Sequence, residues 1–207
     1  MLHSFKLDCP KELKLKLLNK VTCLNSFMEN INKIIKEDFL LLERYFTSVD
    51  KINSNPIDEF KGDAFEVFTE FFINTFKFDN RLGIKEYRPW SIRDDGKDWG
   101  VDGVGYLNGT ISKRITVQCK YRSNKTYFLQ ANEDHISNFV AYTMTSPIYK
   151  DSQMYIFTTA KGLNENTHKS MYHSLIRVFG FFEINKMIGN DNIAFWENFL
   201  AELVKQS

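Results

Sequence analysis

The residues best suited to chemistry lie between positions 98 and 122. Asp102 is a carboxylate in the glycine-rich run Gly100-Val101-Asp102-Gly103, and Gln118 and Lys120 follow in the run Val117-Gln118-Cys119-Lys120. Residues two apart on a β-strand project to the same face, so Gln118 and Lys120 share one face of that segment. A carboxylate, an amide oxygen and an ammonium group could together bind Mg²⁺ and hydrolyse a phosphodiester.

In such a site Asp102 would be the central metal ligand, with the amide oxygen of Gln118 and the backbone carbonyl of Cys119 completing the set. Mg²⁺ takes only one or two protein carboxylates and keeps several waters, and Mn²⁺ accepts the same oxygen ligands. Lys120 would hold the attacking water or offset phosphate charge. Asp98 is a weaker candidate for the same site. Because an amide is uncharged, Gln118 leaves the site one charge short of an all-carboxylate version.

The two segments that carry these residues must pair in one particular register. If Asn108-Gly109 formed a two-residue hairpin turn, Asp102 would lie opposite Ile115, and its side chain would point away from Gln118. A shared site needs Asp102 roughly opposite Gln118, which a longer loop or a bulge would give. We therefore predict a longer loop from about Leu107 to Lys113.

A long helix is predicted before these strands. Asn55 can cap it, Pro56 suits its first position, and its apolar residues run to about Phe76. Glu66 and Glu70 lie four residues apart on one side of it, and spacing alone leaves open whether they reach solvent or the edge of a site.

The order of predicted elements after residue 55 indicates an α/β fold with a mixed sheet. The long helix is followed by three strands, the first over Gly83–Arg88. Then come a helix over Asn132–Thr145 with Asn132 as its cap, a strand over Gln153–Thr159 and a helix over Asn164–His173. The chain ends with a strand over Ile176–Phe182, a turn or short helix over Ile184–Ile188 and a last helix capped by Asp191.

The N-terminal part of the chain has a different character. Residues 10–50 carry apolar residues at three- and four-residue spacing, which predicts two or three amphipathic helices. The polar stretch Ser48–Pro56 marks a boundary. We therefore predict a helical appendage over residues 1–54, for packing or dimerisation, and a second domain over residues 55–207.

Composition limits the partners and the compartment. The net charge of the 207-residue chain is +1, so nucleic-acid binding would depend on a local basic surface. The candidates for that surface are Arg93, Lys113, Arg114, Arg122 and Lys125. Three scattered cysteines do not form a disulfide framework or a zinc site, and the sequence has neither a signal-peptide pattern nor a long apolar run. We expect a cytoplasmic protein without a membrane partner.

Other catalytic classes find little support in the sequence. It has no Gly-rich phosphate loop ending in Lys-Ser or Lys-Thr, which speaks against an ATPase. His168 and His173 are five residues apart, an unsuitable spacing for a shared metal site on one helix, and a cluster with His135 would need their helices to meet. Cys119 falls on the apolar face of its strand, where a core position is the simpler interpretation than a nucleophile.

Taken together, the motifs resemble the Mrr-like branch of the PD-(D/E)xK restriction-endonuclease superfamily, in a Gln-x-Lys variant. The resemblance covers about residues 57–205. It rests on Gly100–Gly103 followed by Val117–Lys120, on the helix segment Lys61–Glu66, on Ile156–Gly162, which is similar to a strand of nuclease domains fused to helicases, and on Phe195-Trp196.

The resemblance implies an α/β/α sandwich with a mixed central sheet and active-site positions at Asp102, Gln118, Lys120 and Glu66. It also implies Mg²⁺, DNA as partner, and dimerisation, for which the N-terminal helices are the candidate surface. The expected function is a metal-dependent DNA endonuclease. The alternatives are a catalytically inactive DNA-binding or assembly module, and a nuclease for branched or RNA-containing substrates. The N-terminal helices match nothing in that nuclease core, so a helicase or another protein is a further candidate partner.

Overall fold

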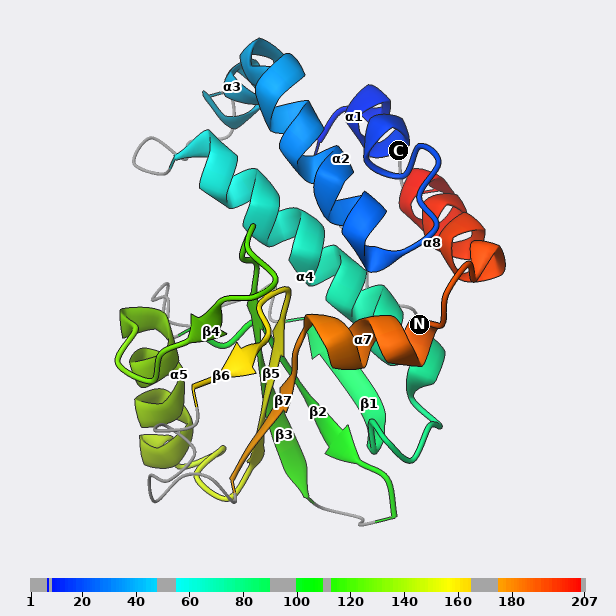
Figure 1. Cartoon of the computed structure of the whole chain (residues 1–207). Coiled ribbons are helices and arrows are strands. Elements are labelled where there is room, and N and C mark those ends of the chain that lie inside the picture. The colour runs from blue at the N-terminus through cyan, green and yellow to red at the C-terminus, as the bar shows by residue number, and fades with distance from the viewer. Residues whose placement is uncertain are drawn as a thin grey trace. The chain divides into compact units, whose positions relative to one another are not determined.

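The computed structural model describes residues 7, 9–47, 55–89, 100–109, 113–164 and 175–205 (Figure 1). The chain is a mixed α/β protein that divides into two compact units. One unit comprises the residues up to Phe68 together with those from Phe182 onward, and the other comprises Thr69–Phe181. No helix in the described ranges has the length and apolar character needed to cross a membrane.

The first unit is helical. Its elements are α1 (Lys11–Leu17), α2 (Leu24–Glu37), α3 (Phe39–Thr47), the first part of α4 (Pro56–Phe76), most of α7 (Phe181–Ile188) and α8 (Ile193–Lys205). The prediction of two or three helices in residues 10–50 is confirmed. Phe27 of α2 is fully buried, with its ring centroid 5.3 Å from that of Phe68, 5.8 Å from Trp196 and 6.1 Å from Phe199. These aromatic rings form the centre of the unit.

This grouping differs from the predicted boundary after residue 54. The N-terminal helices share their core with the first part of α4 and with α8, both of which were assigned to the second domain. The polar composition of residues 48–56 marked a connection between helices. It carried no information about which aromatic side chains would meet across it.

The start of α4 follows the prediction closely. The side-chain oxygen of Asn55 accepts the Ile57 N–H at 3.1 Å, and its carbonyl accepts the N–H groups of Asp58 and Glu59. Asp58 and Glu59 also place negative charge in the first turn, which suits the helix dipole. The predicted helix over residues 56–76 is confirmed.

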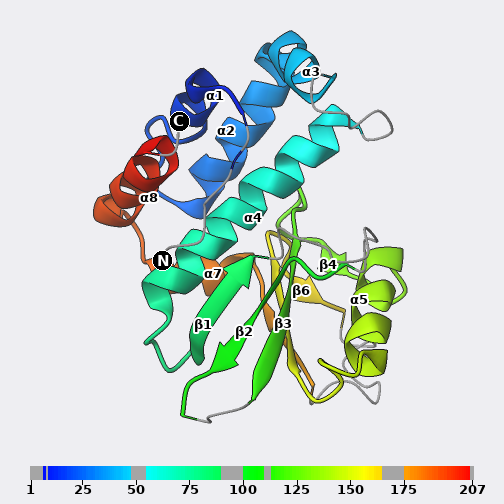
Figure 2. The ribbon, with the colours of Figure 1, turned by 180° about the vertical axis from the view of Figure 1, so that it is seen from behind.

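The second unit is built on a five-stranded mixed sheet. Its strands lie in the order β1 (Ile84–Pro89), β2 (Gly103–Leu107), β3 (Arg114–Lys120), β5 (Gln153–Thr158) and β7 (Ile176–Phe179). The first three, side by side in Figure 2, pair antiparallel. Strands β3, β5 and β7 pair parallel. Helix α5 (Asp134–Thr145) makes the crossover from β3 to β5.

Each face of the sheet has its own apolar packing. On the α5 side a buried cluster includes Phe139 of α5 together with Met154 and Ile156 of β5. On the other side Phe72, in the last turns of α4, lies edge-on to Phe157 with ring centroids 6.1 Å apart. Phe157 also stacks on Phe179 of β7 at 5.1 Å. Within this unit, helical residues therefore cover both faces of the sheet.

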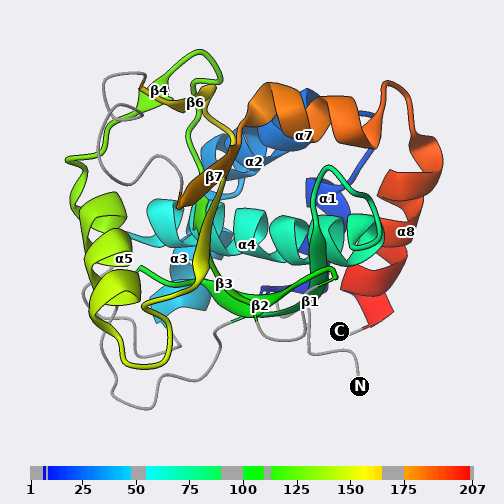
Figure 3. The ribbon, with the colours of Figure 1, turned by 90° about the horizontal axis from the view of Figure 1, so that it is seen from below.

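Three further findings correct or extend the predicted elements. A small parallel sheet of β4 (Phe128–Leu129) and β6 (Gly162–Leu163) was not predicted (Figure 3). Helix α5 begins after Glu133, so Asn132 is not its cap. Helix α8 is capped by Asn192, whose side-chain oxygen accepts the Phe195 N–H at 3.1 Å, and not by Asp191. Asn164 is described, but the remainder of the helix predicted over 164–173 lies outside the described residues.

Candidate functional site

The pairing of β2 with β3 brings Asp102 to the part of β3 that contains Gln118. Gly103 pairs with Val117 and Gly105 with Ile115, and Asp102, just before β2, also contacts Val117 through its backbone N–H. The Leu107 N–H donates to the Lys113 carbonyl at 3.0 Å and closes the connection between the strands. The prediction of a longer loop in place of a two-residue turn is therefore confirmed.

The carboxylate of Asp102 lies against the backbone of β3. One of its oxygens accepts the N–H of Cys119 at 2.6 Å, and the Asp102 N–H donates to the Val117 carbonyl at 2.8 Å. These two bonds hold Asp102 against β3 just before β2 begins. Its half-buried carboxylate is fixed beside the residue that separates Gln118 from Lys120.

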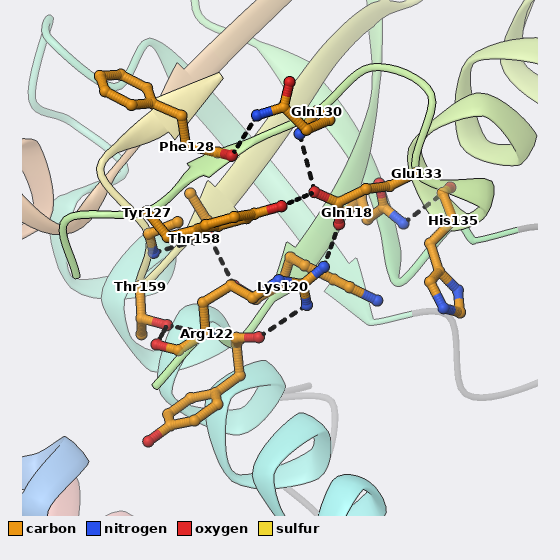
Figure 4. Close-up of polar contacts among 12 residues, drawn as sticks. Gln118, Lys120, Arg122, Tyr127, Phe128, Gln130, Glu133, His135, Thr158 and Thr159 are labelled. Atoms are coloured by element: carbon orange, nitrogen blue, oxygen red, sulfur yellow. Dashed lines mark hydrogen bonds and ion pairs between the residues drawn. The ribbon is translucent and has the colours of Figure 1, made fainter. Parts of the chain in front are cut away.

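Gln118 is buried, with 3% of its surface exposed, and its amide is held in one orientation. The amide nitrogen donates to the backbone carbonyl of His135 on α5 at 3.1 Å (Figure 4). The reverse orientation would direct two oxygens at each other, so the side-chain oxygen must point away from α5. No hydrogen-bond donor among the described residues reaches that oxygen. Gln118 therefore presents a buried, fixed and unsatisfied oxygen, which normally costs free energy unless water or a cation binds it.

Gly100 makes room for this arrangement. Its φ is +70°, and a Cβ at this position would lie 3.0 Å from the His135 carbonyl oxygen and 3.2 Å from the Gln118 amide nitrogen. A side chain would therefore press against the hydrogen bond that orients Gln118, and its backbone conformation would also be strained. The glycine noted in the sequence has a steric role at the site.

The polar face of β3 is covered and not solvated. Strand β3 lies in the middle of the sheet, and Thr116 is buried with its hydroxyl 3.1 Å from that of Thr143 on α5. Ile115 and Val117, on the opposite face, are also fully buried, so both faces of the strand are covered there. Lys120, two residues after Gln118, is half-buried at the end of the strand.

The two glutamates of α4 fall in different units. Glu66 is half-buried and belongs to the helical unit, so its predicted part in the site stays a prediction. Glu70 belongs to the same unit as Asp102, and 4% of its surface is exposed. Burial raises the pKa of Glu70 to about 7. The spacing of the two glutamates left open whether they reach solvent. The structure shows that Glu70 does not, and its burial is the cause of its raised pKa.

The candidate DNA-binding residues do not form one surface. Lys113 directly precedes β3 and Arg114 begins it, whereas Lys120 ends the strand, and the six steps between Arg114 and Lys120 span about 20 Å. Arg114 donates to the Ile148 carbonyl at 2.8 Å. Lys125 lies 5.2 Å from the centre of the Phe181 ring. Of the predicted set, Arg122 and Lys125 therefore lie on the same side of the unit as Lys120, while Arg93 and also Asp98 lie outside the described residues.

Arg122 has partners of its own within the unit. Its guanidinium forms an ion pair with Glu133 and donates to the Tyr121 carbonyl, while its backbone N–H and carbonyl both contact the Thr159 hydroxyl (Figure 4). Burial alone would raise the pKa of Glu133, but the Gln130 N–H and Arg122 outweigh it, so the pKa is lowered. Glu133 stays ionised and neutralises Arg122.

Glu133 and His135 are the contributors that sequence reasoning missed. Glu133 also accepts the Gln130 N–H at 2.8 Å and a hydrogen bond from the Tyr127 hydroxyl at 3.3 Å, so it organises the segment between β3 and α5. His135 contributes its backbone carbonyl, while its imidazole side is exposed. A backbone contact leaves no signal in residue types. His168 and His173 lie outside the described residues.

A carboxylate and a neutral side-chain oxygen are the kinds of donor that Mg²⁺ binds together with several waters. Within the described ranges, no group of three or more His, Cys, Asp or Glu side chains could hold a metal. Asp102 supplies one carboxylate and Gln118 one neutral oxygen. Mg²⁺ commonly uses one or two protein carboxylates and retains several waters, so this sparse set is compatible with it.

Comparisons of this chain with family models, with curated proteins and with solved structures give no significant match.

Proposed function

We propose that this protein is a metal-dependent DNA endonuclease whose site comprises Asp102, Gln118 and Lys120. The observation that carries the proposal is the buried side-chain oxygen of Gln118, which is fixed by the His135 carbonyl and has no donor among the described residues. The next residue along β3, Cys119, donates its N–H to the Asp102 carboxylate at 2.6 Å, so a carboxylate lies beside the same part of the strand. An oxygen with no donor is suited to a cation.

The topology of the second unit is consistent with this proposal. The chain runs from α4 through three antiparallel strands, crosses by α5, and returns as β5 parallel to β3. Helical residues pack on both faces of this mixed sheet. This is the arrangement expected for the restriction-endonuclease-like α/β/α sandwich that the motifs resemble, and it places Asp102 and Lys120 at strand ends.

In the proposed site Asp102, Gln118 and the Cys119 carbonyl would hold Mg²⁺. In an extended strand the N–H and C=O of one residue point to the same edge, and the Cys119 N–H points to Asp102. The Cys119 carbonyl therefore shares the edge of β3 that faces Asp102. Bound Mg²⁺ or Mn²⁺ supplies an activated water and neutralises phosphate charge. Glu66 remains a proposed fourth contributor.

Lys120 would act on the substrate side of the site. It projects from the same face of β3 as Gln118, two residues further along. Its ammonium group would position the attacking water by hydrogen bonding, or stabilise the negative charge that develops on the phosphate. Arg122 follows on the same segment, where its ion pair with Glu133 reduces the positive charge that it offers to DNA.

A DNA-binding module without catalysis is the second candidate, and one observation favours it. Asp102 satisfies the Cys119 N–H and Gln118 satisfies the His135 carbonyl, so both side chains already stabilise the fold. These contacts would persist in a protein that binds DNA but does not cleave it. Salt-sensitive DNA binding without metal-dependent cleavage would identify this alternative.

Cleavage of supercoiled plasmid by the purified protein tests the proposal. We expect nicking or linearisation that requires Mg²⁺ or Mn²⁺ and falls by about 100-fold or more in Asp102→Asn and Lys120→Ala. The matched controls Asp151→Asn and Lys85→Ala alter exposed residues and should keep full activity. Equal cleavage by wild type and both site variants would refute the assignment. Branched DNA and RNA–DNA hybrids in the same assay distinguish the substrate classes.

A further inference from the structure

A cavity lies at the end of the second unit opposite the proposed nuclease site. It has a volume of about 430 Å³ and is lined by Gly83, Leu107, Asn108, Gln153, Tyr155, Ile176 and Arg177. Gln153 and Ile176 begin the parallel strands β5 and β7, whereas Lys120 pairs with Thr158 at the other end of β5. The five steps from Gln153 to Thr158 separate the two regions by about 16 Å.

Arg177 is held rigidly at this cavity. Its guanidinium lies over the rings of Tyr155, 5.9 Å from the centroid, and of Phe179, 5.2 Å from the centroid. It donates to the backbone carbonyls of Leu82, at 3.4 Å, and of Arg81. The Tyr155 hydroxyl donates to the same Leu82 carbonyl at 3.2 Å. These contacts fix the direction of the guanidinium before any ligand arrives.

The positive charge of Arg177 is not neutralised by these contacts. Both of its hydrogen-bond acceptors are neutral carbonyls, and no carboxylate in the described part of the chain pairs with it. Asp79, the acid nearest in sequence to its anchoring carbonyls, is paired with Arg81 at 2.6 Å. A guanidinium has five N–H donors, so at least some of those on Arg177 remain for a ligand. An arginine that is preoriented and lacks an acid partner is suited to an oxyanion.

Two side-chain amides also belong to the lining of the cavity. Asn108 and Gln153 line the cavity, and Asn108 is anchored through its amide nitrogen to the Lys77 carbonyl at 3.0 Å. Leu107, Ile176 and the Tyr155 ring provide apolar surface. A concave space of a few hundred cubic ångströms with one charge, a few amides and apolar walls is typical of a small-molecule site.

We infer that this cavity binds a small molecule of about mononucleotide size through an oxyanion group, phosphate or carboxylate, that contacts Arg177. The inference is independent of the nuclease proposal, because none of the lining residues belongs to that site. Phosphate and carboxylate present the same oxygen chemistry to a guanidinium, so separate probes must identify which group the cavity accepts.

Calorimetric titration of the full-length protein tests this inference. The probes are dAMP, deoxyadenosine, inorganic phosphate and citrate, each added in EDTA at constant ionic strength. We expect binding of dAMP or citrate and none of deoxyadenosine, with affinity reduced at least about tenfold in Arg177→Gln. Arg114→Gln is the matched control, since Arg114 is also exposed and also donates to a backbone carbonyl. It should bind the probe as wild type does.

The pattern across probes decides the outcome. Binding of dAMP and phosphate but not citrate assigns a phosphate ligand. Binding of citrate but not dAMP or phosphate assigns a carboxylate. Absence of binding by every oxyanion probe would overturn the inference, as would equal binding by wild type and Arg177→Gln. If Arg177→Gln instead weakens only duplex DNA binding, Arg177 is a DNA backbone contact and the small-molecule site is wrong. Unchanged plasmid cleavage in Arg177→Gln would keep this result separate from the nuclease test.

Discussion

Replacing Gln118 with Glu changes charge at the candidate site with almost no change in size. The variant loses the amide N–H that donates to the His135 carbonyl at 3.1 Å and places a carboxyl where the unsatisfied oxygen now lies. Without metal, a buried carboxyl that faces a carbonyl, one residue before the Cys119 N–H that contacts the Asp102 carboxylate, destabilises the fold. Loss of one buried hydrogen bond together with poor solvation of the new group costs about 2–4 kcal/mol.

That cost translates into a measurable change in melting temperature. For a chain of this length 1 kcal/mol corresponds to about 2–4 °C, so Gln118→Glu should melt about 5–15 °C below wild type in EDTA. Burial and Asp102 would both raise the pKa of the new carboxyl above its unfolded value. Its neutral form is therefore the one that the fold tolerates, and the variant should lose stability as the pH rises from about 5 to about 8.

Mg²⁺ should reverse much of this loss. For wild type with a Kd of about 1 mM, 10 mM Mg²⁺ adds about 1.4 kcal/mol, or about 3–6 °C. In Gln118→Glu a second carboxylate joins Asp102, so affinity and stabilisation by Mg²⁺ should both exceed those of wild type. The control Gln153→Glu, at the opposite end of the sheet, should gain no more than wild type.

Calorimetric melting of the three proteins in EDTA and in Mg²⁺ provides the comparison. An equal shift by Mg²⁺ in wild type, Gln118→Glu and Gln153→Glu would refute the metal site. Equal melting temperatures of wild type and Gln118→Glu in EDTA would contradict the buried, oriented amide itself.

Three further predictions concern other parts of the chain. Burial raises the pKa of Glu70 to about 7, so its ionisation opposes folding. Glu70→Gln should therefore be more stable than wild type by about 2–3 kcal/mol above about pH 7, and about equally stable near pH 4. The same difference in free energy of unfolding at both pH values, measured in urea, would contradict this. Glu133→Gln should remove the ion pair that neutralises Arg122 and make the plot of log affinity for DNA against log salt concentration steeper by about one phosphate contact. Gel-shift titration at several salt concentrations measures that slope, and an unchanged slope would exclude Arg122 as a DNA contact. Gly105→Ala should unfold far below wild type, since its Cβ would lie 1.9 Å from the Glu86 carbonyl oxygen, whereas Gly62→Ala meets nothing within 4 Å and should be neutral or stabilising by up to about 1 kcal/mol; similar melting temperatures for the two would contradict the strand packing.

Local signals predicted the elements that depend on local chemistry. Asn55 and Pro56 identified the start of α4 because capping and a fixed proline φ act within a few residues. The register of β2 and β3 was predictable for a different reason. Requiring Asp102 to lie opposite Gln118 selected the longer loop over the Asn108-Gly109 turn.

Features that depend on distant segments were not predictable in the same way. Nothing in the sequence of β3 indicated that α5 covers its polar face, where the Thr116 hydroxyl contacts that of Thr143 and the Gln118 amide nitrogen donates to the His135 carbonyl. The small sheet of β4 and β6 is too short to produce a periodic pattern. The shared aromatic core of α2 and α8 joins segments more than 150 residues apart, which no local boundary signal reports.

The most direct test of the proposed site is anomalous diffraction from crystals soaked in Mn²⁺. The account predicts a peak with the Asp102 carboxylate and the Gln118 side-chain oxygen both within about 2.0–2.6 Å, and loss of that peak in Asp102→Asn. A difference map that shows only water at the Gln118 oxygen, with any Mn²⁺ bound elsewhere, would contradict it.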